Sequence, residues 1–320
     1  MVLNDLIYIA AGSKSQGTGH LRRSSQIIRL LRSKGLPLRS VSLIGDKADR
    51  ERLVPFLGDY DECAGLPDEI QPGDERCAVV DVHDDIQPEI LPWLHQHSLR
   101  TLALDWYTDP GQCIAVRINL RGGSSALKYC IIRDEFIKAK KRYYGHRPKF
   151  DAAVVMGGGD RRLHIPAFLA HFSREAYFAD KTMAVVLGPM VHNTEMTTPS
   201  RDSNILFYEA PRNVSDIMAR SAVGISNGGS ALMEFTMLGI PTIIFPQTEK
   251  EDAFIETFLK AGCSILGSLD PNEFARQFRK FRENDMLRRE MSEKAVNLVD
   301  GSGADRVADE IKKFLRGGPA

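Results

Sequence analysis

The sequence lacks the cysteine pairs of zinc-binding or disulfide-linked proteins and the long apolar runs of membrane-spanning proteins. Its five cysteines are Cys63, Cys77, Cys113, Cys130 and Cys263. They form no CxxC pair, which argues against a zinc site or a disulfide framework and fits a reducing compartment. No apolar run approaches the roughly 18 residues that a transmembrane helix needs. The first residues, MVLNDLIYIAAG, carry neither a basic region nor a cleavage pattern, so we expect no signal peptide and a cytoplasmic location.

The sequence also lacks an excess of charge of either sign. Its 42 Lys and Arg balance 42 Asp and Glu, whereas a general nucleic-acid binder normally carries a basic excess that neutralises phosphates. We therefore expect no nucleic-acid partner and no stable membrane insertion. The basic stretch 138–151 contains interleaved aromatic residues, which can mark single-stranded nucleic-acid binding. Because Gly145 and Pro148 interrupt it and a new strand follows, we interpret it as a solvated linker.

What is present is an alternation of strands and helices along nearly the whole chain. Expected strands cover 6–10, 41–44, 78–82, 101–105, 152–156, 183–188, 204–208, 223–226 and 241–245. Expected helices cover 19–34, 47–57, 85–97, 213–221, 230–238, 249–261 and 305–315. The strands are continuous apolar runs, which is typical of parallel sheets covered on both faces. Two helical faces within 274–294 are strongly charged and are expected to face solvent.

The length of 320 residues fits two domains. A buried strand that runs into a glycine-rich turn occurs at the start of each half of the chain. We therefore predict an α/β protein with two Rossmann-like domains, 1–145 and 146–320. The last helix could pack back on the first domain.

The motif GTGHLRR at 17–23 joins the first strand to the first helix. Gly17 and Gly19 would let backbone amides approach an anion at the helix N-terminus. Arg22 stands where the dinucleotide fingerprint has its third glycine, which disfavours an NAD enzyme. His20 lies in the first helical turn, where the helix dipole favours the neutral ring that a general base requires. The alternative is a histidine that only packs or caps the turn.

A second motif, SNGGSALMEF at 226–235, follows another buried strand. Gly228 and Gly229 would form a tight turn, Ser230 would cap the next helix, and backbone amides there could hold a diphosphate. Glu234, about one turn further, could accept both hydroxyls of a ribose. The alternative is a capping motif with Glu234 as a solvated acid.

Three glycines follow the strand at 152–156. Gly157 and Gly158 could admit a nucleotide close to the backbone, or they could form only a sharp turn.

Polar residues cluster at two further strand ends. In VVDVHDD at 79–85, Asp81 or His83 could face a sugar, and the neighbouring acids could bind a metal or cap the next helix. Asp105 begins the segment DWYTD. Its Trp106 and Tyr107 could form a platform for a sugar or pack beneath a loop.

Several of these motifs occur in the order found in one family. They are GTGHLRR at 17–23, VVDVH at 79–83, LALD at 102–105, IIRDEF at 131–136, FDAAVVMGGGD at 150–160 and the block NGGSALMEF to LGIPTIIF at 227–245. Together they resemble the UDP-2,4-diacetamido-2,4,6-trideoxy-β-L-altropyranose hydrolases of pseudaminic acid biosynthesis and the related spore-coat polysaccharide proteins. The second half is also similar to the nucleotide-binding domain of the N-acetylglucosaminyltransferase that forms lipid II.

The resemblance implies a GT-B fold, in which two Rossmann-like domains face each other across a cleft and the second holds the nucleotide. It implies that water cleaves a UDP-sugar at C1 and releases UDP, with neither a metal nor an organic cofactor. Matched by position, His20 would be the base, and Asp81 would precede the sugar pocket. Gly228, Gly229 and Ser230 match the diphosphate turn, Glu234 matches the ribose acid, and Arg133 and Glu135 match the family's IR-acid-E-F segment.

The sequence departs from the family mainly at sugar-side positions. Ala10, Ala11 and Gly12 replace part of an Arg-x-Asp-x-Ser run, His83 replaces a common tyrosine, and Trp106 replaces an acid. An Asn-Gln pair is missing near Gln247. The sugar is therefore the least specified part of the prediction. An inverting GT-B glycosyltransferase that uses His20 on an acceptor hydroxyl remains the main alternative, and a non-catalytic nucleotide-sugar sensor is a third.

Overall fold

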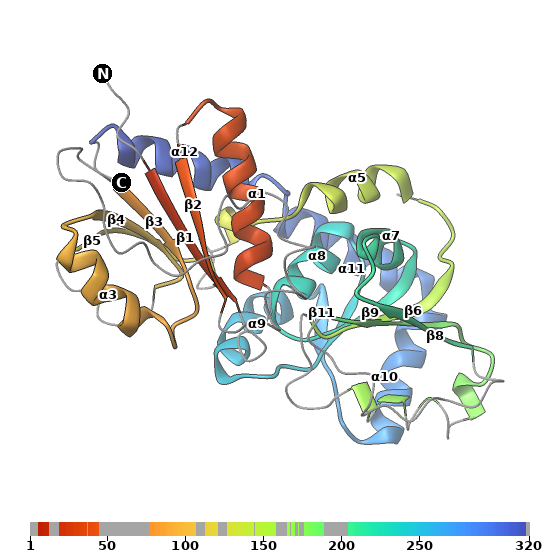
Figure 1. Cartoon of the computed structure of the whole chain (residues 1–320). Coiled ribbons are helices and arrows are strands. Elements are labelled where there is room, and N and C mark those ends of the chain that lie inside the picture. The colour runs from red at the N-terminus through yellow and green to blue at the C-terminus, as the bar shows by residue number, and fades with distance from the viewer. Residues whose placement is uncertain are drawn as a thin grey trace. The chain divides into compact units, whose positions relative to one another are not determined.

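The structure is a computed structural model of the whole chain. It describes residues 6–12, 19–36, 38–44, 77–106, 113–120, 127–143, 145–157, 165–166, 168–169, 172, 176–188 and 204–317. The chain forms two compact units (Figure 1): Met1–Ile131 with Ser302–Ala320, and Ile132–Gly301. The expected helix 47–57 lies outside the described residues, as do Gly17, Tyr107 and Gly158.

The first unit is built on a parallel sheet of order β2-β1-β3-β4-β5. Its strands are β1 (Leu6–Gly12), β2 (Leu38–Ile44), β3 (Cys77–Asp81), β4 (Arg100–Leu104) and β5 (Ile114–Ile118). Its helices are α1 (Gly19–Ser33), α3 (Gln87–Gln96), η1 (Leu127–Tyr129) and α12 (Gly303–Leu315). Every residue of β1 and β3 is buried, which explains their lack of polar alternation. The strand order reverses between β1 and β3, the point at which such sheets bind ligands.

Helix α12 returns from the far end of the sequence to this first unit. It packs against α1 and η1, and Val307, Ile311 and Phe314 are fully buried. Gly303 makes the approach possible, because a Cβ at this position would lie 2.0 Å from the carbonyl oxygen of Cys130. The guanidinium of Arg100 donates to the carbonyl of Phe314 at 2.9 Å. Packing and hydrogen bonding therefore both attach this helix to β4 and α1.

The second unit contains a six-stranded parallel sheet of order β11-β10-β9-β6-β7-β8. Its strands are β6 (Phe150–Val155), β7 (Met183–Leu187), β8 (Ile205–Glu209), β9 (Ser221–Ser226), β10 (Thr242–Ile244) and β11 (Ser264–Leu266). Its helices are α5 (Asp134–Tyr143), η2 (Ala176–Phe178), α7 (Val214–Ala219), α8 (Ser230–Leu238), α9 (Glu249–Ala261), α10 (Pro271–Glu283) and α11 (Asp285–Leu298). The reversal of strand order falls between β6 and β9.

The interpretation of 138–151 as a linker differs from the structure. The first part of this stretch, 138–143, belongs to α5, which packs against α7 and α8 and buries Phe136 and Ala139. The division between the units falls earlier, between Ile131 and Ile132. The helix was not predicted because most of its residues are charged and only a narrow apolar face is buried.

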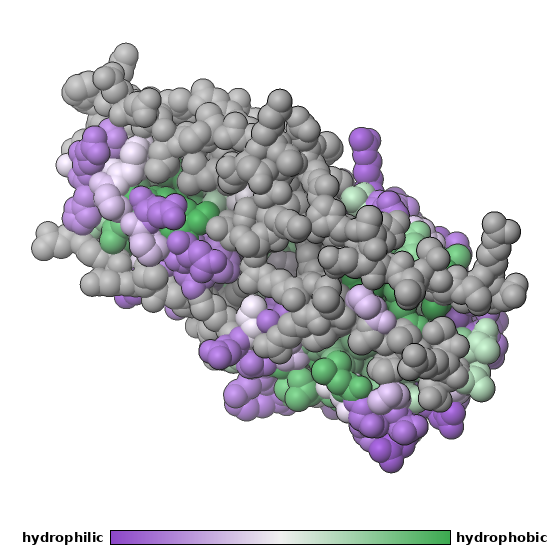
Figure 2. Space-filling view, turned by 60° about the horizontal axis from the view of Figure 1, so that its bottom comes forward, coloured by the Kyte–Doolittle hydropathy of each residue, from purple (hydrophilic) through white to green (hydrophobic). Residues whose placement is uncertain are grey.

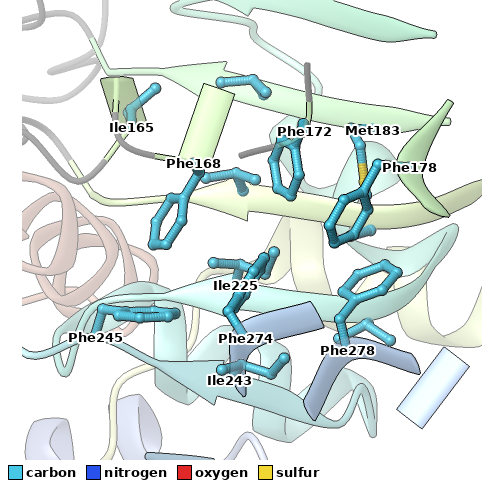
Figure 3. Packing of buried hydrophobic residues seen from close by; sticks show 14 of the residues in the cluster. Ile165, Phe168, Phe172, Phe178, Met183, Ile225, Ile243, Phe245, Phe274 and Phe278 are labelled. Atoms are coloured by element: carbon cyan, nitrogen blue, oxygen red, sulfur yellow. The ribbon is translucent and has the colours of Figure 1, made fainter. Parts of the chain in front are cut away.

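Aromatic side chains fill the core on one side of the second sheet (Figure 3). Phe168, Phe172 and Phe178 pack with Phe274 and Phe278 of α10, with ring centroids 5.3–6.1 Å apart between the two groups. The expectation that charged faces within 274–294 meet solvent therefore leaves out one face of α10, which is buried. Its charged residues lie on the other face, since Phe274, Phe278 and Phe281 recur at helical spacing and are buried.

The surface fits the balanced composition of the sequence. On the face in Figure 2, hydrophilic and apolar side chains are interspersed among the described residues. Over the same residues, none of the helices has the length and apolar character needed to cross a membrane.

Candidate active site

His20 lies beside Asp81 at the strand-order reversal of the first unit. His20 is the second residue of α1, and Asp81 is the last residue of β3. The Nδ1 atom of His20 is 2.8 Å from Oδ1 of Asp81, which is fully buried. An ionised carboxylate only accepts hydrogen bonds, so Nδ1 carries the proton and donates it. The basic position of the ring is then Nε2, the arrangement found in histidines that act as general bases.

Arg23 holds the same carboxylate from one helical turn further along α1. Its Nε lies 3.1 and 3.0 Å from the two oxygens of Asp81, and one terminal nitrogen lies 2.5 Å from Oδ1. The other terminal nitrogen donates to Asp105 at 2.7 Å. Ser24 adds an O–H donor to Asp81 at 2.6 Å. Arg23 also comes within 3.0 Å of His20 Nδ1. Since both nitrogens carry protons, we interpret this proximity as shared donation to Asp81.

The charges of this group stabilise one another in spite of burial. Burial by itself would raise the pKa of Asp81, but the nearby charges of Arg23 and His20 and their hydrogen bonds outweigh it and hold the pKa well below its usual range. Burial would likewise lower the pKa of Arg23, yet Asp81 and Asp105 keep it above its ordinary value. Asp81 is therefore charged at neutral pH. It can stabilise the imidazolium that forms when His20 takes up a proton.

Asp105 supports Arg23 from the end of β4. Its backbone φ of +52° lies in the left-handed region, which non-glycine residues rarely adopt. Its Oδ1 accepts from the Leu120 amide at 2.6 Å, and its carbonyl accepts from the side chain of Gln87 at 3.0 Å. The neighbouring Trp106 is only 2% exposed and belongs to the core of this unit. Of the two readings of Trp106, the structure therefore favours packing over a sugar platform.

His83 lies near this group and binds its own neighbours. Its ring centroid is 6.0 Å from that of His20. Its Nδ1 lies 3.2 Å from Asp84 and 3.1 Å from Asp85. One ligand atom from each of these three residues lies within 4.8 Å of the others, close enough to share a divalent cation. All three belong to one short turn after β3, so the same geometry also serves a simple hydrogen-bonded turn.

The glycine turn of the second unit joins β9 to α8. Gly229 occupies the N-cap of α8 in an extended conformation, and no side chain makes a capping hydrogen bond. Ser230 is the first helical residue, so the prediction that it caps the helix is wrong. Gly157, which follows β6, has a φ of +80°, and a Cβ there would lie 3.7 Å from Nδ2 of Asn227. The turns after β6 and β9 are thus neighbours at the strand-order reversal of this sheet.

Glu234 is joined to Arg133 and Glu135 within the second unit. It is 7% exposed, and its Oε1 lies 2.9 Å from both Nε and a terminal nitrogen of Arg133. The other terminal nitrogen of Arg133 donates to Glu135 at 2.7 Å. The alternative in which Glu234 is merely a solvated acid is therefore wrong. Arg133 and Glu135, which match one segment of the family, thus form a connected group with Glu234, which matches another.

Two residues in these groups were not assigned from the sequence. Arg23 follows His20 by three residues, a spacing that places both side chains on one helix face; this signal was available in GTGHLRR. Glu251, in the first turn of α9, accepts hydrogen bonds from Asn227, Gly228 and Gln247. No sequence motif identified Glu251. Its position in the first turn of a predicted helix does not indicate that its carboxylate reaches the glycine turn at Gly228.

The comparisons with known proteins agree on the fold. No family model matches the chain. The spore coat polysaccharide biosynthesis protein SpsG of Bacillus subtilis is 26% identical over 185 residues, which are 56% of this chain and 55% of that protein. The chain thus spans about half the length of this curated relative, and the similarity agrees with the spore-coat part of the resemblance.

Solved structures align over nearly the whole chain. MurG of Acinetobacter baumannii aligns with a TM-score of 0.58 and 11% identity, covering 97% of this chain and 99% of that one. The UDP-GlcNAc 2-epimerase of Neisseria meningitidis bound to UDP-GlcNAc aligns with a TM-score of 0.57 and 11% identity, covering 97% and 100%. Together with the two parallel sheets, these similarities show that the chain has the GT-B fold of two Rossmann-like units.

Proposed function

We propose that this chain is a nucleotide-sugar enzyme that hydrolyses a UDP-activated amino or deoxy sugar at C1, in the biosynthesis of a surface polysaccharide. The observation that carries the proposal is the buried pair of His20 and Asp81 at the strand-order reversal of the first unit. A protonated Nδ1 held by a charged carboxylate leaves Nε2 as the basic nitrogen of the ring.

In the proposed reaction, His20 removes a proton from water as the water oxygen attacks C1 of the sugar. The bond between C1 and the diphosphate oxygen breaks, and UDP leaves with the electron pair. Backbone amides at Gly228, Gly229 and Ser230 would stabilise the charge that develops on the diphosphate. Glu234 would accept the ribose hydroxyls. No metal or organic cofactor takes part in this scheme.

The choice of UDP and of a polysaccharide pathway is supported by the related proteins. The Neisseria structure contains UDP-GlcNAc on the same fold, and the Bacillus relative is named for spore-coat polysaccharide biosynthesis. The class of sugar comes from the resemblance of the ordered motifs.

An inverting glycosyltransferase is the second candidate. It is favoured by the similarity to MurG over nearly the whole chain. The same base, His20, would then activate an acceptor hydroxyl in place of water.

The decisive experiment measures UDP release from a panel of UDP-sugars, with and without candidate acceptor sugars. Sustained UDP release in water alone, with free sugar as the product, is expected for the hydrolase. Release that depends on an added acceptor would replace it with the transferase. If no UDP is released from any UDP-sugar under either condition, both the hydrolase and the transferase proposals are wrong.

A further inference from the structure

The glycine turn between β9 and α8 already holds a carboxylate of the chain itself. Glu251 accepts through Oε1 from the side-chain amide of Asn227 at 2.8 Å. Through Oε2 it accepts from the backbone amides of Gly228 at 3.2 Å and Gln247 at 2.6 Å. Three N–H donors thus converge on one negative group. One of these donors, the Gly228 amide, belongs to the turn whose backbone amides are proposed to hold the diphosphate, whereas the Gln247 amide lies outside that turn.

Glu251 does not act as an ordinary helix cap. Thr248 caps α9 and accepts from the Glu251 amide at 3.2 Å, which is half of a capping box. In that motif the acidic side chain turns back to the amide of the cap residue itself. The Glu251 carboxylate instead accepts from the amide of Gln247, the residue before the cap, and from the amide of Gly228 in a separate segment. The carboxylate therefore serves the glycine turn as well as its own helix.

The glycine at position 228 makes this contact possible. A Cβ there would lie 2.7 Å from both Glu251 Cβ and Ile255 Cγ2, closer than real side chains approach. Because residue 228 has no side chain, α9 packs directly on the turn. That packing brings the carboxylate of Glu251 to the Gly228 amide.

We propose that Glu251 is an internal competitor for the anion-binding donors of the glycine turn, so that a diphosphate enters only when this side chain moves away. The inference rests on the proposed function, in which Gly228 to Ser230 hold the diphosphate. While the carboxylate accepts from the Gly228 amide, this donor is not available to a diphosphate, and the affinity of the turn for anionic ligands is lowered. Small anions such as free phosphate or pyrophosphate therefore bind weakly, whereas a nucleoside diphosphate gains enough from its other contacts to displace Glu251 at low concentration.

The test compares two substitutions that remove the same charge from the same helical turn. Glu251→Gln keeps the shape of the side chain but weakens its hydrogen bonds, because charge-assisted bonds are about twice as strong as neutral ones. Glu249→Gln alters an exposed residue and measures the general effect of charge. Calorimetric titration with inorganic pyrophosphate should show about 10-fold tighter binding to Glu251→Gln and less than about 2-fold change for Glu249→Gln.

Three results would overturn the inference. They are equal gains in both variants, unchanged or weaker binding to Glu251→Gln, and failure of pyrophosphate to bind either the wild-type chain or Glu251→Gln. The first would show only a long-range effect of charge. The second would show that Glu251 is a fixed clamp that the turn needs.

A measurement on the wild-type chain gives an independent test that needs no variant. Pyrophosphate that displaces Glu251 removes an acceptor from the Gln247 amide, so amide hydrogen exchange at Gln247 should become faster on saturation. Unchanged or slower exchange would overturn the inference. If exchange and affinity behave as expected but no UDP-sugar is turned over, the proposed function fails and this inference stands.

Discussion

At the scale of single residues, Asp81 illustrates how a buried charge is maintained. Its carboxylate accepts from His20, Arg23 and Ser24, all on the first turns of α1. Removing one partner of a buried ion pair leaves the other charge uncompensated, which typically costs more than the pair contributes. The residue should therefore affect both the stability of the first unit and its dependence on pH.

Asp81→Asn should lower the free energy of unfolding by about 3–5 kcal/mol at neutral pH, because among the described residues Arg23 then keeps only Asp105 as a charged partner. The folded pKa of Asp81 lies below its ordinary value of 3.8. Its ionisation therefore stabilises the folded state above that value, and this stabilisation is lost as the pH falls below it. Urea unfolding of both proteins from about pH 7 to about pH 3 should show a smaller loss for the variant.

The matched control is Asp85→Asn, which alters an exposed acid on the turn after the same strand. It should change the free energy of unfolding by less than about 0.5 kcal/mol. Equal destabilisation by both substitutions would mean that the network around Asp81 contributes nothing specific.

His20→Asn should reduce turnover by about 10²–10⁴-fold, the usual contribution of a general base. Its affinity for UDP should stay nearly unchanged, because the proposed nucleotide site lies in the second unit. UDP release and calorimetric titration measure the two quantities, with the exposed His95→Asn as control. Near-normal turnover in a folded His20→Asn protein would place the base elsewhere, first at His83.

The sequence predicted parts of this group. The motifs placed His20 at a helix start and Asp81 at a strand end, and the structure brings the two together because β1 and β3 are parallel neighbours. It did not identify Arg23 as their partner. Helical spacing shows that Arg23 shares a face with His20, but it cannot show that this face meets a carboxylate 58 residues away.

At the scale of elements, helices with clear end signals were predicted best. The ranges 230–238 and 249–261 agree with α8 and α9 to the residue. Each ends at a glycine, Gly239 or Gly262, in the left-handed conformation. The strands β5 and β11 were not predicted, because β11 has three residues and β5 alternates between half-buried and exposed positions. Such short edge strands lack the continuous apolar run that marked the others.

Helix α10 allows a test of whether a helix rich in charged residues contributes to the hydrophobic core. Phe278 is fully buried among aromatic rings, so Phe278→Ala should lower the free energy of unfolding by about 3–5 kcal/mol. Lys280→Ala, two residues along on the exposed face, should change it by less than about 0.5 kcal/mol. Guanidinium unfolding followed by circular dichroism measures both. Similar small changes in the two variants would contradict the packing of α10 in the core.

At the scale of the whole molecule, the two units differ in how the chain builds them. The second is one continuous segment, Ile132–Gly301, whereas the first needs residues from both sides of that segment. The alternation of strands and helices predicted the α/β class, and the ordered motifs supplied the GT-B expectation. The boundary could not be predicted, because the basic composition of α5 is also that of a linker.

A fragment of residues 132–301 should therefore unfold cooperatively on its own and, if the proposed nucleotide site is complete, bind UDP as the full chain does. A chain that ends at Gly301 should instead lose stability in the first unit, because it exposes the surface that Ile311 and Phe314 cover. Thermal unfolding by circular dichroism and calorimetric titration with UDP test both chains. A fragment without a cooperative transition would contradict the division into units.

The return of α12 to the first unit also sets an order of events during translation. Domains generally fold as units as the chain emerges from the ribosome, with the N-terminal one first. Here the first unit cannot complete its core until α12 has emerged, and the whole of Ile132–Gly301 emerges before that helix. The segment translated first is thus completed last. Until then the first unit lacks the helix that packs against α1 and η1, and the surface that Ile311 and Phe314 cover stays exposed.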